Sequence, residues 1–357
     1  MTELTAGPDD QGRRLDRVLR RVLPGVPLSA LHRAFRKRRI RVDGRRARPE
    51  HRLSRGETIT LPPGLASEAV VSADDPQEHT PVMGVHGEIP ENKVARRIHT
   101  AHKPGQQLEV LIQGPDLIAV NKPVGISTHG PGSLQHLVAQ YSRARSNRSL
   151  AFRPAPLHRL DRHTSGVVIC AATIEGAQRF SQLLRARQVS KWYLALLDGI
   201  VPKGTRWEDR LERDGRTGRT QRAGSGRGQE ATAEVTPLLH NSDAKLTLAA
   251  VRLITGRRHQ IRAQAALRGV PLLGDSRYSP HSPHDPHDRG HLLHAAAVVL
   301  EHGEGLLGSR SVSAPLPETA RRRIQRLFGE AAPQHAQALL SDLVRQGQDA
   351  PAGSAPQ

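Results

Sequence analysis

The stretch HRLDRHTSG, residues 158–166, places one aspartate among basic side chains just before the apolar run VVICAA. Asp161 has Arg159 and Arg162 as near neighbours, and positive charge close to a carboxyl group favours its ionised form. An ionised carboxylate here suits a solvated ion pair at the surface. It equally suits an anion that must act beside a polyanionic partner, which would otherwise repel it. The stretch alone does not decide between these two interpretations.

The composition points to a polyanionic partner. The 357 residues carry 53 Lys and Arg against 34 Asp and Glu, a formal net charge of +19. Each phosphate that such a chain neutralises releases counterions, so nucleic acid is the first expectation. No apolar run reaches the length of a membrane-spanning helix, which argues against a membrane partner. The N-terminal stretch MTELTAGPDDQGRR lacks an apolar segment of signal-peptide type, so we expect a cytoplasmic protein.

The first part of the chain is a dense basic module. Residues 13–55 hold 16 Lys and Arg against three acids. Apolar residues at helical spacing in RRLDRVLRRVLPG predict a helix, and PLSALHRAFRKRR predicts a second one with Ser29 as its N-cap. The Asp-Gly pair of IRVDGRRA predicts a hairpin, and SRGETITL predicts a further strand. A basic helical face without any RNA role is the alternative interpretation of this module.

The rest of the chain changes character twice. Residues 65–112 lose the periodicity and are expected to be a linker or insertion, although HKPGQQLEVLI (102–112) predicts a strand that pairs back on the first module. Short apolar runs then dominate, and they predict strands at 116–125, 166–173, 191–201, 231–239 and 246–256, with helices at 175–187 and 257–269. Many strands with few intervening helices predict an α+β fold with a mixed or antiparallel sheet. Cys170, the single cysteine, is expected to be a small buried strand residue.

Four polar stretches follow apolar strands, where loops on a rigid scaffold commonly carry function. They are NKPVG (121–125), HRLDRHTSG (158–166), KWYLALLDG (191–199) and TGRRHQIRAQAALRGVPLLGDSRY (255–278). In this order and at these spacings they resemble the RluA-type family of RNA pseudouridine synthases, over about residues 113–320. The basic module ahead of them resembles the S-four type of RNA-binding domain, the usual companion in that family.

These resemblances imply a domain plan. We expect an S-four-like RNA-binding domain at 1–64, a linker or insertion at 65–112, and an α+β pseudouridine synthase catalytic domain at 113–330. A C-terminal helix and a disordered tail are expected at 331–357, where the last residues are rich in Gly, Ala, Pro and Gln.

The family resemblance also implies a reaction and its residues. The N-glycosidic bond of a uridine is broken, the base rotates, and it is rejoined to the sugar through carbon, without a cofactor. The catalytic aspartate of the family falls on Asp161. The arginine that pairs with it falls on Arg262, and the tyrosine that stacks near the target base falls on Tyr193. We therefore expect these three residues to carry catalysis.

Further residues are candidate RNA contacts. The target uridine must leave its stack, and the family's arginine that enters the vacated space falls on Arg159. Arg162, Lys122 and Lys191 stand at motif positions and suit either RNA or structural contacts. In the first module the candidate contacts are Arg36, Lys37 and Arg38. The Arg- and Gly-rich stretch 215–228 is expected to be a mobile loop.

A cluster of histidines invites a metal interpretation. It comprises His281, His284, His287, His291 and His294. Pro283 and Pro286 break any helix there, no cysteine accompanies the histidines, and the family uses no metal. We therefore expect a polar surface loop and no metal site.

The expected protein is a monomeric, cytoplasmic synthase acting on large-subunit ribosomal RNA. Three alternatives stay open. The first is a synthase directed at tRNA, and the second is a non-catalytic RNA-binding or ribosome-assembly factor on the same fold. The third is a hydrolase that uses the histidines.

Overall fold

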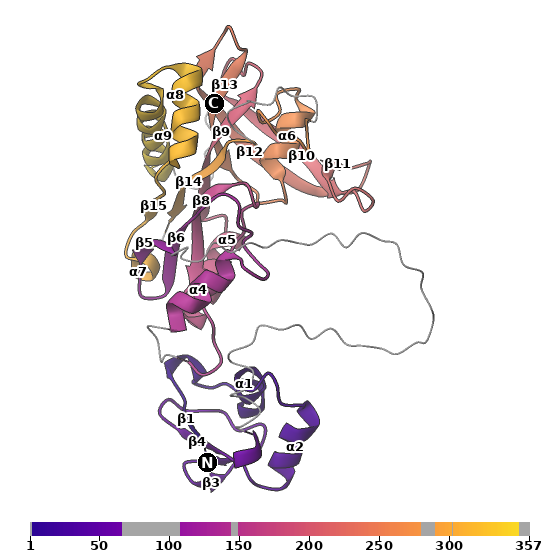
Figure 1. Ribbon diagram of the computed structural model, residues 1–357, viewed down its shortest axis with the longest axis vertical. Helices are drawn as coiled ribbons and strands as arrows, with labels where there is room; N and C mark the ends of the chain where they lie inside the picture. Colours follow the sequence, from indigo (N-terminus) through magenta and orange to yellow (C-terminus); the bar gives the residue numbers. More distant parts are fainter. Residues whose placement is uncertain (1, 66–107, 144–148, 280–289, 302, 350–357) are drawn as a thin grey trace, which may run out of the picture. The chain divides into compact units, whose positions relative to one another are not determined.

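The chain divides into two compact units (Figure 1). The computed structural model describes residues 2–65, 108–143, 149–279, 290–301 and 303–349. The first unit takes its residues from 1–104 and 141–153, and the second from 105–140 and 154–357. The sequence-based plan differs in placing 141–153 in the catalytic domain expected at 113–330.

The first unit is built on a four-stranded antiparallel sheet in the order β1-β4-β2-β3. Its elements are β1 (Thr2–Thr5), a 3-10 turn (Pro8–Asp10), α1 (Leu15–Val22), α2 (Leu28–Arg36), β2 (Arg41–Val42), β3 (Arg45–Arg46) and β4 (Thr58–Leu61). The hairpin predicted from the Asp-Gly pair is confirmed. Asp43 and Gly44 have φ of 45° and 72°, the left-handed conformation that a two-residue hairpin turn of this kind requires at both positions.

The two helices of this unit bury one face each, as their spacing predicted. Leu19 of α1, and Leu31 and Phe35 of α2, all lie in the core. The prediction of Ser29 as N-cap is wrong, because α2 begins at Leu28 with Pro27 as its N-cap residue. The fixed φ of proline suits the start of a helix, and it moves the boundary two residues earlier than the serine suggested.

A buried carboxylate fastens a later segment into the first unit. Asp10, which is fully buried, accepts hydrogen bonds from the Ser149 hydroxyl at 2.6 Å and the Leu150 amide at 2.7 Å. Ala151 next to them is buried in the same core as the two helices. The segment 149–153 is therefore an integral part of the first unit.

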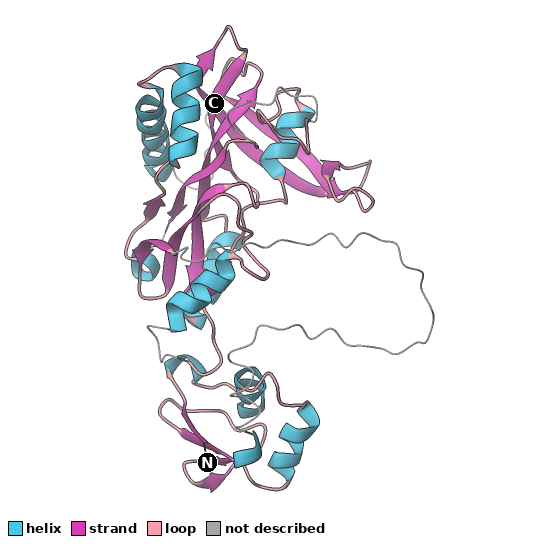
Figure 2. Cartoon of the chain, in the orientation of Figure 1, coloured by secondary structure: helices cyan, strands magenta, loops and turns pink. Residues whose placement is uncertain are grey.

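The second unit is organised around a large mixed sheet (Figure 2). Its central path runs β11-β10-β12-β13-β9-β14-β8-β6-β5, with β15 on β14 and β7 on β8. The strands are β5 (Glu109–Gln113), β6 (Leu117–Lys122), β7 (Ala155–Pro156), β8 (Ser165–Ala171), β9 (Val189–Asp198), β10 (Thr205–Arg213), β11 (Thr220–Arg222), β12 (Gln229–Asn241), β13 (Leu246–Leu253), β14 (Leu293–Leu300) and β15 (Ser311–Ser313). The β14–β8 pair is parallel, whereas the strand pairs around it are antiparallel. The predicted α+β class is confirmed.

Two local predictions about this sheet are wrong. The segment 109–113 does not pair back on the first module, because as β5 it pairs with β6 of the large sheet. The Arg- and Gly-rich stretch 215–228 is not simply a mobile loop, because Thr220–Arg222 forms β11 and pairs with β10. Backbone pairing decided both cases, and composition did not reveal it.

Helices cover both faces of the sheet. They are α4 (Leu134–Arg143), α5 (Ile174–Arg185), α6 (Gln260–Leu267), α7 (Glu304–Leu307), α8 (Glu318–Phe328) and α9 (Ala332–Asp349). Leu194 of β9 packs in one cluster with α8 and α9, and Trp192 packs with α9. Because side chains alternate along a strand, Tyr193 between them faces the opposite side. Within the described residues, no helix is long and apolar enough to cross a membrane.

The glycine that closes HRLDRHTSG allows the parallel β8–β14 pairing. Gly166 has a φ of 111°, and a Cβ added there would lie 2.1 Å from the carbonyl oxygen of Ala295 in β14. We expect Gly166→Ala to lower the free energy of unfolding by about 3 kcal/mol or more, because strand backbone must move. Gly215→Ala, in open space with an ordinary φ, should change it by less than about 0.5 kcal/mol. Urea denaturation of both variants measures the free energy of unfolding. Equal values for the two variants would contradict the role of Gly166 in the β8–β14 pairing.

Candidate active site

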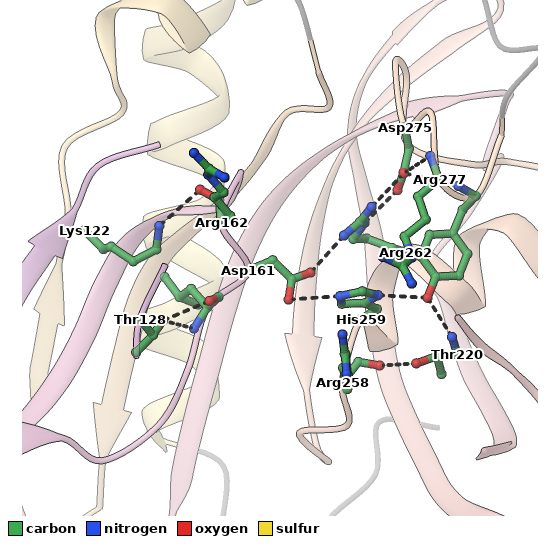
Figure 3. Close-up of polar contacts among 12 residues, drawn as sticks. Lys122, Thr128, Asp161, Arg162, Thr220, Arg258, His259, Arg262, Asp275 and Arg277 are labelled. Atoms are coloured by element: carbon green, nitrogen blue, oxygen red, sulfur yellow. Dashed lines mark hydrogen bonds and ion pairs between the residues drawn. The ribbon is translucent and has the colours of Figure 1, made fainter. Parts of the chain in front are cut away.

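Asp161 lies on a tight turn that a threonine holds from the side (Figure 3). The hydroxyl of Thr128 accepts a hydrogen bond from the Leu160 amide at 3.0 Å and donates one to the Leu160 carbonyl at 2.9 Å. On the other side the Thr164 amide donates to the Asp161 carbonyl at 3.1 Å. Both flanks of Asp161 are thereby fixed before β8 begins.

The lysine of the NKPVG motif supports this turn from beneath. Lys122 is fully buried, and its ammonium donates to the carbonyls of Pro123 at 2.9 Å, Ile126 at 2.8 Å and Arg162 at 3.4 Å. Burial lowers the pKa of Lys122 to about 7, with the charge of Asp161 opposing that shift. A buried ammonium offers no surface to a phosphate. We therefore replace the interpretation of Lys122 as an RNA contact with that of a structural bridge.

The second motif delivers an arginine on a helix that is buried on most sides. The amide of Gln264 in α6 donates to the carbonyls of Trp207 at 3.2 Å and Ala231 at 3.0 Å, and to Asp209 at 2.9 Å. The Gln260 amide donates to the Thr232 carbonyl at 3.0 Å. Buried amides satisfied in this way anchor α6 to the sheet, because leaving them unpaired would cost stability.

Arg262 joins two carboxylates (Figure 3). Its Nε and Nη2 each donate to Asp275 at 2.8 Å, and its Nη1 donates to Oδ2 of Asp161 at 3.1 Å. Burial opposes ionisation of Asp275, but the bonds from Arg262 prevail and hold the pKa of that carboxyl below its usual range. The predicted pairing of Arg262 with Asp161 is thus present, with Asp275 as a second anion that the sequence analysis missed.

The neighbours of Asp161 in sequence are not its partners in space. Arg162 turns away, and its Nε donates to the Gly125 carbonyl at 2.8 Å. Arg159 is exposed and lines the same cavity as Asp161. The guanidinium that contacts Asp161 therefore comes from Arg262 of α6 and not from these two neighbouring arginines.

The three expected catalytic residues meet at one cavity in the second unit. It is lined by Arg159, Leu160, Asp161, Thr164, Tyr193, Leu253, Arg257, His259, Gln260, Ile261, Arg262 and Leu293. Tyr193 is 6% exposed, and burial, with the nearby charge of Asp161, raises the pKa of its hydroxyl. A neutral ring beside an anchored carboxylate could stack on a flat ligand while Asp161 reaches it.

The remaining candidate RNA contacts lie outside this cluster. Lys191 in β9 is half-buried, and burial lowers the pKa of its ammonium. Arg36, Lys37 and Arg38 are exposed at the end of α2 in the first unit. The structure does not test whether these residues contact RNA, so that role stays a prediction.

His259 and Tyr278 are two further site residues that the sequence analysis did not assign, although both lie in its motifs. His259, just before α6, places Nε2 at 3.5 Å from Oδ1 of Asp161, and its Nδ1 lies 3.0 Å from the hydroxyl of Tyr278. The ring of Tyr278 also lies against Arg262, whose guanidinium carbon is 5.1 Å from the ring centre. The signal was present in HQIR and GDSRY, but the sequence alone did not show that these letters converge.

The histidine cluster divides in two. His281, His284 and His287 lie outside the described residues, whereas His291 and His294 lie within them, and His294 is buried in β14. Its Nε2 faces the Ala314 carbonyl at 3.3 Å, so that nitrogen carries the proton and Nδ1 accepts from the Ser165 hydroxyl at 2.9 Å. Within the described ranges, no group of three or more His, Cys, Asp or Glu side chains is arranged to hold a metal ion.

Comparison with known proteins assigns this arrangement to a family. Residues 116–267, which include all three expected catalytic positions, match the sequence model described as RNA pseudouridylate synthase. This stretch of the chain is similar to that family. The RluA-type resemblance and the prediction of an isomerase that makes pseudouridine in RNA are confirmed. The resemblance of the first unit to an S-four domain stays a prediction.

Full-length relatives and solved structures agree with this assignment. The chain is 29% identical over 326 residues to a Pasteurella multocida protein named ribosomal large subunit pseudouridine synthase C, covering 88% of this chain and 90% of that protein. It is 28% identical over 337 residues to the protein of the same name from Escherichia coli K12, covering 89% and 94%. The structure of human RNA pseudouridylate synthase domain containing 4 covers 61% of this chain and 92% of its own, with a TM-score of 0.52 at 23% identity. This last likeness shows a shared fold.

Removing the charge of Asp275, the buried partner of Arg262, should lower the free energy of unfolding strongly. Asp275 is 1% exposed, and Asp275→Asn would leave the charge of Arg262 short of its bidentate anion. We expect a loss of about 3–5 kcal/mol in the free energy of unfolding, measured by urea denaturation. Asp342→Asn, which breaks an exposed pair with Arg345 in α9, should cost less than about 1 kcal/mol. Similar losses of unfolding free energy in both variants would show that the buried Arg262–Asp275 pair stabilises the protein no more than the exposed pair does.

Proposed function

We propose that this chain converts uridines of large-subunit ribosomal RNA to pseudouridine, with Asp161 as the catalytic carboxylate. The observation that carries the proposal is the Asp161 carboxylate fixed by Arg262 at a cavity that Tyr193 also lines. The ribosomal substrate is suggested by the printed names of the relatives, which align with nearly nine-tenths of the chain.

The proposed reaction is an isomerisation whose atoms balance. The bond between N1 of the base and C1′ of the ribose breaks, the base turns within the cavity, and a bond from C5 to C1′ forms. The C5 proton is lost and N1 gains one, so neither a redox partner nor an energy source is needed. Asp161 starts the cleavage, either as a nucleophile at the sugar or as a base that abstracts a proton from it.

The other residues hold charge and base in place. Arg262 holds the carboxylate of Asp161 in place, since its Nη1 lies 3.1 Å from Oδ2. Tyr193 retains the detached base by stacking, which prevents its escape. Arg159, exposed at the cavity, is free to take the place of the base once the uridine has flipped out of its stack.

We further propose that the first unit binds RNA through phosphates. Arg36, Lys37 and Arg38 are exposed at the end of α2, and three cations in a row suit a phosphate backbone better than any single base. Because the candidate site is complete within one chain, we propose a monomer. A ribosomal substrate would be met in the cytoplasm, which is where we propose that the protein acts.

Removing the negative charge of Asp161 tests the catalytic assignment. Asp161→Asn keeps the size of the side chain, and Arg262 retains Asp275, so the variant should fold and bind RNA. Pseudouridine formation should fall below detection, because the anion that starts cleavage is gone. Asp243→Asn, exposed in the turn between β12 and β13, serves as the control. Ordinary turnover by purified Asp161→Asn protein would refute the assignment.

A competition between RNAs tests the substrate. Protein-free large-subunit ribosomal RNA and tRNA are offered at equal concentration, and pseudouridine is mapped in each. We expect it in the ribosomal RNA, because a separate basic unit raises the effective concentration of a helix near the target, and a compact tRNA offers few such helices. Preferential modification of tRNA would support the tRNA alternative. Binding without pseudouridine in either RNA would support a non-catalytic factor.

A further inference from the structure

A line of contacts leads from Thr220, the first residue of β11, to the carboxylate of Asp161 (Figure 3). The amide of Thr220 donates to the hydroxyl oxygen of Tyr278 at 2.9 Å. That hydroxyl lies 3.0 Å from Nδ1 of His259, and Nε2 of the same ring lies 3.5 Å from Oδ1 of Asp161. These groups are well shielded from solvent, since Tyr278 is 9% exposed and the His259 side chain 8%.

The direction of the hydrogen bonds follows from the chemistry of the groups. A backbone N–H only donates, so the Tyr278 oxygen accepts from Thr220 and its own proton is available for His259. Because the carboxylate of Asp161 that faces Nε2 only accepts, the single ring proton of a neutral His259 lies on Nε2, and Nδ1 accepts from the Tyr278 hydroxyl. The N–H that results faces Asp161.

Burial, together with nearby cations, favours the neutral form of His259. Burial lowers the pKa of His259 to about 4, and Arg262, Arg258 and Arg277 act in the same direction against the opposing charge of Asp161. Two guanidinium groups lie near the ring of Tyr278, with Arg219 at 5.2 Å and Arg262 at 5.1 Å from its centre. These contacts restrain Tyr278, and its hydroxyl in turn fixes the orientation of the His259 ring.

We propose that His259 is a positioning residue for Asp161: its Nε2–H holds Oδ1 while Arg262 holds Oδ2, and Tyr278 selects the tautomer that makes this possible. The inference rests on the proposed role of Asp161. The distance of 3.5 Å is long for a hydrogen bond, and hydrogen bonds at a substrate-free active site often tighten when substrate binds. With both oxygens held, the carboxylate plane is fixed relative to the ribose.

A pair of amide substitutions tests the reach of this donor. Glutamine places its amide nitrogen near the position of Nε2, whereas asparagine is one methylene shorter and does not reach Asp161. His259 has a φ of 51°, a left-handed conformation that asparagine adopts readily, so His259→Asn should fold. We expect His259→Asn to lower kcat by about 10²-fold with KM for RNA unchanged, and His259→Gln to recover most of kcat. Equal kcat in both variants would overturn the proposal.

A double-variant cycle tests the link to Tyr278. Tyr278→Phe keeps the ring against Arg262 but removes the hydroxyl, and we expect kcat to fall by roughly tenfold. Combined with His259→Asn, it should cause no further loss, because the tautomer no longer matters once the imidazole is gone. Additive losses would show that Tyr278 and His259 act separately and would overturn the proposed link.

A spectroscopic readout is independent of turnover. In the full chain with ¹⁵N-labelled histidine, two-bond correlation spectra should show His259 neutral with its proton on Nε2 at pH 7, and Tyr278→Phe should yield a tautomer mixture. A proton on Nδ1 would overturn the proposal. Failure of the proposed function has a different pattern, because wild-type protein would then make no pseudouridine, or Asp161→Asn would remain active. If those two results stand and His259→Asn keeps full kcat, only the positioning role fails.

Discussion

A single buried guanidinium, shared by two carboxylates, is the interaction on which the site depends. Asp275 takes two of the five N–H donors of Arg262 in a bidentate pair, and one of the remaining donors, on Nη1, binds Asp161. A buried cation without a strong partner would cost several kcal/mol, and Asp275 supplies that partner permanently. Arg262 can therefore hold Asp161 without depending on it, and the carboxylate can change its charge during a reaction while the arginine stays in place.

The surrounding architecture restrains this group from two directions. On one side α6 is fixed to the sheet by glutamine amides that bind strand carbonyls, so the arginine it carries has little freedom. On the other side Thr128 and Lys122 hold the turn that carries Asp161. These supports use the backbone of strands on the side of α6 and the backbone of the turns next to β6 and β8 on the side of Asp161. The geometry of the site is thus set by the sheet together with turns that are cross-linked to each other.

The sequence was informative where the determining interactions are local or repeat along the chain. The Asp43-Gly44 turn, the helices of the first unit and most strands of the second follow from neighbouring residues. The sequence was not informative where the two interacting residues are far apart in the chain. Asp161 and Arg262 are 101 positions apart, and only the family resemblance joined them, whereas charge patterning pointed to the wrong arginines. The roles of His259 and Tyr278 depend on the rotation of a ring and the direction of a hydroxyl, which no spacing encodes.

The return of residues 149–153 to the first unit has a consequence for modularity. The chain passes between the two units at three places, after residues 104, 140 and 153, so neither unit is a continuous segment. A gene fragment that ends at residue 64 would lack the segment that Asp10 binds, and the remainder would expose Ala151, which is 2% exposed in the intact chain. Recombination at a single boundary would therefore transfer an incomplete core. The RNA-binding candidate and the catalytic unit are expected to be inherited together, as one evolutionary unit, rather than exchanged as separate cassettes.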